Sequence, residues 1–165
     1  MRRPATPEQQ QRRERARLVL MSAPIAAIAG AAVAAAVYVV ARRTGVSMLV
    51  PADPRDVGSS MVPIGLVGVL VSSVFPAFAG AIALALLTRT ARPLTWFVVV
   101  AVVLAGASAG PLLWGRDASM ARMDTATRNA LALMHLLRAA AVVWVLARAY
   151  QARRPQATVP MNRER

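Results

Sequence analysis

Hydrophobic residues fall in four long blocks along the chain, separated by short polar segments. The blocks cover residues 18–41, 62–87, 94–114 and 125–147. Each block is long enough to cross a bilayer core of roughly 30 Å, because a helix rises about 1.5 Å per residue. The pattern therefore predicts an all-α protein, a four-helix transmembrane bundle whose successive spans run up and down.

The polar segments predict basic ends around one membrane domain. The expected parts are a basic cytoplasmic segment at 1–17, the membrane domain at 18–147 and a disordered, flexible basic tail at 148–165. Thr6 followed by Pro7 and Gln9 fits a helix start, so the first helix is expected to begin before the membrane. Pro24 is expected to kink this helix early in the bilayer.

The connections also carry helix signals. Residues 42–61 are rich in proline, glycine and aspartate and are expected to form an aqueous loop of turns. Ser60 and Pro63 suit the cap and the first turn of the second span. Asp124 or Thr125 can cap the fourth span.

The net charge of +13 comes from arginine, since the chain has no lysine. Most arginines flank the apolar blocks, which suits a membrane protein better than a nucleic-acid binder. Thirteen of them lie in the two ends and in the link at 88–93, against six in the other two loops. Because cytoplasmic loops carry the excess of positive charge, both termini are expected to face the cytoplasm from the plasma membrane.

Two ionisable side chains, His135 and Arg138, lie deep in the fourth block, whereas the blocks contain no aspartate or glutamate. Their spacing places them on one helix face. Counting depth along antiparallel spans puts Ser72 and Ser73 at about the same level. Pro76 lacks an N–H and frees the carbonyl of Ser72, which is a candidate acceptor for Arg138.

These four residues, His135, Arg138, Ser72 and Ser73, form the candidate intramembrane polar cluster. The favoured interpretation is that His135 and Arg138 tie the fourth helix to the second, because a charge at this depth costs at least ~2.5 to 3.5 kcal/mol and needs partners. The alternative is a polar passage or pocket for a small anion or a polar headgroup. A dimer contact is a third interpretation. Burial beside a cation is expected to keep His135 neutral.

Other chemistry finds no support in the residues. The chain has no cysteine and a single histidine, so no metal site is expected. No glycine-rich phosphate loop and no G-x-S-x-G setting occur, so neither a cofactor site nor a catalytic residue is proposed. The chain is accordingly not expected to be an enzyme.

A G-x-x-x-G pair, Gly106 and Gly110, lies in the third block. Such pairs let a second helix approach closely, so both glycines are candidate helix-packing residues. The motif is common in apolar helices and names no particular partner.

Several short motifs resemble one family. They are Leu87–Pro93, Pro111–Leu113, Asn129–Leu136, Gly45–Val46 and Val50–Pro51. Over roughly residues 18–147 the chain resembles a family of small four-span membrane proteins from actinobacteria, a domain of unknown function of the 6069 type. The resemblance implies a fold and a lineage and no activity. His135 matches the family's histidine, whereas Arg138 stands where such proteins are usually apolar.

The sequence thus favours an accessory or structural membrane protein that packs against other helices. Its expected partners are the lipid bilayer and other membrane proteins or a second copy of itself, with no nucleic acid. The alternative is a small transporter or channel subunit with a polar site at mid-membrane.

Overall fold

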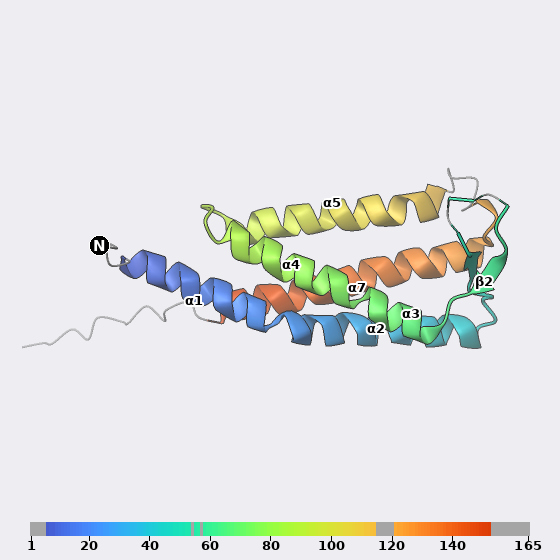
Figure 1. Cartoon of the computed structure of the whole chain (residues 1–165), viewed down its shortest axis with the longest axis horizontal. Helices are drawn as coiled ribbons and strands as arrows, with labels where there is room; N and C mark the ends of the chain where they lie inside the picture. Colours follow the sequence, from blue (N-terminus) through green and yellow to red (C-terminus); the bar gives the residue numbers. More distant parts are fainter. Residues whose placement is uncertain (1–5, 54, 57, 115–120, 153–165) are drawn as a thin grey trace, which may run out of the picture.

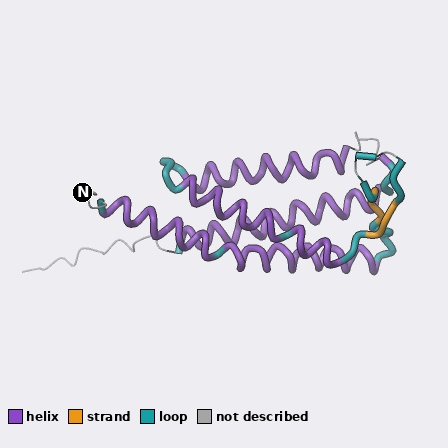
Figure 2. Tube along the Cα trace, viewed as in Figure 1, coloured by secondary structure: helices purple, strands orange, loops and turns teal. Residues whose placement is uncertain are grey.

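The computed structural model of the chain describes residues 6–53, 55–56, 58–114 and 121–152, and these residues are mostly helical (Figures 1 and 2). Its helices are α1 (Pro7–Met21), α2 (Ala23–Arg43), α3 (Leu66–Ser72), α4 (Val74–Leu87), α5 (Pro93–Trp114) and α7 (Thr125–Gln151). By length and composition, four helical units could cross a membrane: Pro7–Arg43, Leu66–Leu87, Pro93–Leu112 and Thr125–Gln151. The all-α class and the four candidate spans are therefore confirmed.

The bundle has two different ends (Figure 1). At one end lie α1, the link between α4 and α5, and the last turns of α7. We call this the basic end and define it as residues 7–17, 88–92 and 148–152. At the other end lie residues 44–53, 55–56 and 58–65 and the start of α7, and we call this the hairpin end. Successive spans therefore run in opposite directions, as expected.

The first span begins and bends where the sequence predicts. The side chain of Thr6 accepts a hydrogen bond from the backbone N of Gln9, and the side chain of Gln9 accepts one from the backbone N of Thr6. These reciprocal bonds satisfy two amides that would otherwise lack partners. The helix is interrupted at Ser22, two residues before Pro24. This interruption separates α1 from α2.

A short β-hairpin, which the sequence analysis missed, closes the hairpin end. Strand β1 (Leu49–Pro51) pairs antiparallel with β2 (Met61–Pro63), and Val50 faces Val62 in the register. The extra bond from the N of Ala52 to the carbonyl of Ser60, 2.8 Å, extends the pairing toward the loop.

The hairpin corrects the expected start of the second span. Ser60 is not a helix cap and Pro63 is not in a first turn, because β2 requires an extended backbone there. The backbone N of Ile64 then donates to the carbonyl of Met48 at 2.9 Å, which continues the extended conformation. The helix starts only at Leu66, after Gly65.

A polar network fastens the hairpin end to α7. Asp124 caps this helix, as expected, with Oδ1 accepting from the backbone N of Thr127 at 2.6 Å. Its Oδ2 accepts from the hydroxyls of Ser47 at 2.6 Å and Thr127 at 2.8 Å. Thr127 Oγ1 in turn accepts from the backbone N of Met48 at 3.2 Å. The network thus joins residues that are almost eighty positions apart.

Helix α7 lies at the centre of the packing. It contacts α1, α2, α4 and α5, and its contact with α2 is the most extensive. It ends at Gln151, so residues 148–151, which were expected in the tail, are helical. The rest of the expected tail, 153–165, lies outside the described residues.

Candidate functional site

The candidate polar cluster starts at the break between α3 and α4. Pro76 has no N–H, so the carbonyl of Ser72 lacks its helical donor. The hydroxyls of Ser72 and Ser73 both donate to the carbonyl of Val69, at 2.9 and 3.0 Å. The carbonyl of Ser72 is thus available to a donor from another helix.

Arg138 supplies the donor from α7. Its Nη1 lies 3.3 Å from the carbonyl O of Ser72 and 3.2 Å from Oγ of the same residue. The Arg138 side chain is half-buried, whereas Ser72 is exposed at the bundle surface. The contact expected from the depth count is therefore present, and it gives the guanidinium two of the acceptors that a charge in a membrane requires.

Gly30 on α2 makes room for the Arg138 side chain. A Cβ built on Gly30 would lie 3.3 Å from Cγ of Arg138 and 3.0 Å from Cγ2 of Val142. The aliphatic part of Arg138 therefore lies against the bare backbone of α2. This role could not be predicted from the sequence, since a glycine in an alanine-rich helix carries no signal that distinguishes it.

His135 belongs to a different contact. Its ring is half-buried, and Nδ1 lies 2.9 Å from the carbonyl O of Leu131, one turn earlier in α7. Because a carbonyl only accepts, Nδ1 is the donor in this bond. In the described part of the chain the structure joins Arg138 to Ser72, beside Ser73, and does not join His135 to them.

The two candidate packing glycines differ in their surroundings. Gly110 is buried, whereas Gly106 is exposed and an added Cβ there would meet nothing within 4 Å. Gly106 therefore contacts no other helix of the described chain. The close approaches within the bundle occur instead at Gly30 and at Gly80, where a Cβ would lie 3.3 Å from Leu146. A contact of Gly106 with another molecule stays a prediction.

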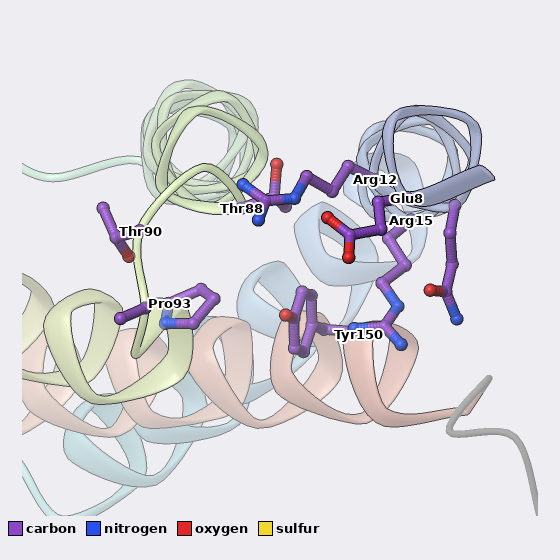
Figure 3. A pocket seen from close by; sticks show the side chains of 9 residues that line it. Glu8, Arg12, Arg15, Thr88, Thr90, Pro93 and Tyr150 are labelled. Atoms are coloured by element: carbon purple, nitrogen blue, oxygen red, sulfur yellow. The ribbon is translucent and has the colours of Figure 1, made fainter. Parts of the chain in front are cut away.

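A cavity at the basic end was not predicted from the sequence. It has a volume of about 320 Å³ and is lined by α1, the α4–α5 link and α7 (Figure 3). Arg12 reaches from α1 toward the end of α4 and donates to the carbonyl of Arg89 at 3.3 Å. Cζ of Arg15 lies 5.8 Å from the centroid of the Tyr150 ring. Three segments distant in sequence build this site, and no motif within one of them indicates it.

The residues that the structure describes offer no set of metal ligands. Among them, no group of three or more histidine, cysteine, aspartate or glutamate side chains could hold a metal ion. The two candidate sites that the structure brings together are the Arg138–Ser72 contact and the cavity at the basic end.

The family described as "Family of unknown function (DUF6069)" matches residues 12–152. The match begins in α1 and ends after α7, so it includes all four candidate spans. The chain belongs to the DUF6069 family. No curated protein and no solved structure matches the chain. DUF6069 membership and the four spans together describe an integral, multi-pass membrane protein of unknown activity, and the family expected from the short motifs is confirmed.

Proposed function

We propose that the chain is an accessory or structural protein of the plasma membrane that packs against the helices of other membrane proteins, and that it is not an enzyme. The observation that carries the proposal is the Arg138 contact. Both acceptors of the guanidinium belong to Ser72 of the same chain. The one charge at mid-span thus serves as a tie between α7 and the α3–α4 break, in place of a ligand site.

Helix α5 offers the surface for a partner helix. It packs mainly against α7 and α4. Only 17% of its most apolar stretch is buried inside the bundle, against 33% of the most apolar stretch of α7. Gly106 is exposed and an added Cβ there meets nothing within 4 Å, so a helix backbone could approach α5 closely at this position. The partner that fits this surface is a transmembrane helix of another protein or of a second copy.

Co-purification from native membranes tests this proposal. The wild-type chain is expected to retain a discrete membrane protein, and Gly106→Leu is expected to lose it, because a bulky side chain blocks the close approach. Gly68→Leu is the matched control. Gly68 is also exposed on a span, also has nothing within 4 Å of an added Cβ, and lies on α3 away from α5.

A second candidate function is that of a small transporter or channel subunit. An Arg138 variant, compared with the Gly106 variant, distinguishes this function from the accessory role. That candidate would use the polar pair Arg138 and Ser72 as its site at mid-membrane. In the accessory role, Arg138→Leu keeps the partner and folds as well as wild type or better, because the cost of the charge disappears. Loss of cellular function in well-folded Arg138→Leu protein, with Gly106→Leu silent, would support the transporter instead.

We also propose that the basic end faces the cytoplasm. Of the arginines outside the spans, thirteen belong to the two termini and the link at 88–93 and six to the other two loops, which is the pattern that the positive-inside rule associates with cytoplasmic termini. Reporter fusions at residues 90 and 160 are expected to give a cytosolic signal, and a fusion at residue 55 an external one. An external signal at position 160 would contradict this orientation. An external signal at 160 together with a cytosolic one at 90 would also contradict the two spans between them.

A further inference from the structure

We infer that the cavity at the basic end binds the headgroup of an anionic phospholipid, a phosphate diester that carries a hydroxylated substituent such as glycerol. Pockets that hold small molecules measure roughly 300 to 1,000 Å³. At about 320 Å³ this cavity suits a headgroup and is too small for a whole lipid. The inference concerns a different part of the molecule from the α5 surface and holds whichever way the bundle is oriented.

Two arginines supply the donors for the phosphate. In the described part of the chain, Arg12 uses one N–H on the Arg89 carbonyl, and Arg15 lies over the ring of Tyr150. A guanidinium has five N–H donors, so most of them stay available to an anion, which they can bind in bidentate fashion. Figure 3 shows Arg12 extending from α1 toward Thr88 and Arg15 extending toward Tyr150, with the Glu8 carboxylate between them. Glu8 is the one carboxylate among the lining residues, so the arginines outnumber it.

The guanidinium of Arg15 is partly buried beside the cavity. Its Nε is buried and has no hydrogen-bond partner among the described residues. A buried donor of a charged group is unfavourable unless an opposite charge lies close. A phosphate bound to the terminal nitrogens of Arg15 would place an opposite charge close to this buried donor, without bonding to Nε itself.

The threonines indicate what accompanies the phosphate. Thr88 Oγ1 donates to the carbonyl of Ala85 at 2.7 Å, and Thr90 Oγ1 donates to that of Leu87 at 2.8 Å. Their hydroxyl hydrogens are therefore occupied, and their lone pairs can accept from a ligand. A hydroxylated headgroup supplies such donors without placing an ammonium beside two arginines.

The position of the cavity favours a lipid over a free phosphate ester. Leu86, two residues before Thr88, is 60% exposed, and Trp96, three residues after Pro93, is 55% exposed. The cavity thus lies where the polar end of the bundle meets its apolar surface, the level at which tryptophan and headgroups are found. A headgroup in the cavity leaves its acyl chains along that apolar surface, and basic pockets between spans are known to select anionic lipids.

Binding of phosphatidylglycerol to the full chain in a neutral detergent tests the inference, with the shift of the thermal unfolding temperature as the measurement. Phosphatidylglycerol is expected to raise this temperature, and phosphatidylcholine is expected to leave it unchanged. Arg12→Gln with Arg15→Gln should weaken the apparent affinity by about fivefold for each arginine. Arg13→Gln with Arg17→Gln is the matched control, since these exposed arginines lie on the same helix but do not line the cavity.

Three results would overturn the inference or a part of it. If the apparent affinity for phosphatidylglycerol fell equally in the Arg12/Arg15 and the Arg13/Arg17 double variants, the lipid would be bound by general charge attraction and not by the cavity. If soluble glycerol 3-phosphate competed at the same concentration as the lipid, the ligand would be a free phosphate ester and not a lipid headgroup. If phosphatidylserine bound as tightly as phosphatidylglycerol, the preference for a headgroup with a hydroxylated substituent would be contradicted.

A milder variant covers the case in which the double arginine variant does not fold. Arg12→Gln with Thr90→Val changes two exposed side chains and retains the Arg15–Tyr150 contact. It is expected to weaken phosphatidylglycerol binding while the unfolding temperature without lipid stays near that of wild type. Unchanged binding in this folded variant would contradict the site.

Discussion

Replacing Gly30 by leucine is expected to lower the free energy of unfolding by about 1 to 3 kcal/mol, the usual cost of overpacking, or by more. The first added carbon would lie 3.0 Å from Val142 and 3.3 Å from Arg138. The rest of the leucine side chain needs space that α7 occupies. Helix α2 must therefore move away from α7, or Arg138 must give up its bonds to Ser72. Thermal unfolding in a neutral detergent measures the loss.

Gly106→Leu is the control for this prediction. It makes the same change in another span, at a position where an added Cβ meets nothing within 4 Å. Its unfolding temperature in detergent should stay near that of wild type. Equal stability of the Gly30 and Gly106 variants would contradict the close packing of α2 against α7.

The second large effect is expected at Asp124. Asp124→Ala removes the cap of α7 and the shared acceptor of Ser47 and Thr127, and loss of a cap costs about 0.5 to 2 kcal/mol. Asp124→Asn should cost much less at neutral pH, because asparagine also caps helices. The order of stability in detergent should therefore be wild type, then Asn, then Ala.

The same carboxylate should make stability depend on pH. The hydrogen bond from the Ser47 hydroxyl, followed by those from Thr127, holds the pKa of Asp124 below its ordinary value of 3.8. A carboxyl whose pKa is lowered by folding stabilises the folded state above its unfolded pKa, and this contribution is lost as the pH falls through the folded pKa. The difference in unfolding temperature between wild type and Asp124→Asn should therefore be constant near neutral pH and shrink in acid below about pH 4. A difference that grows in acid would contradict the assigned direction.

Much of the fold follows from local properties of the sequence. The spans could be predicted because each one is a continuous apolar block, and the caps at Thr6 and Asp124 because each depends on residues within one turn. The contact of Arg138 with Ser72 could also be anticipated. A proline removes one N–H at a known position, and antiparallel spans fix which residues share a depth.

Features that depend on distant segments could not be predicted in this way. The hairpin pairs residues 49–51 with 61–63 across a long loop, and its strands are too short to show alternation. The cavity at the basic end requires α1, the α4–α5 link and α7 to meet, and no single segment carries its pattern. Whether Gly30 or Gly106 meets a helix of the chain depends on how the helices are rotated, which apolar composition alone does not determine.

The central place of α7 has a consequence for biosynthesis. Synthesis proceeds from the amino terminus, so the first three spans enter the membrane before the helix that contacts α1, α2, α4 and α5 exists. Until then the α2 face around Gly30 is uncovered, and Ser72 has no guanidinium to bind. The bundle closes after the ribosome has made residue 151, which makes the last span to emerge from the ribosome the one that completes the fold.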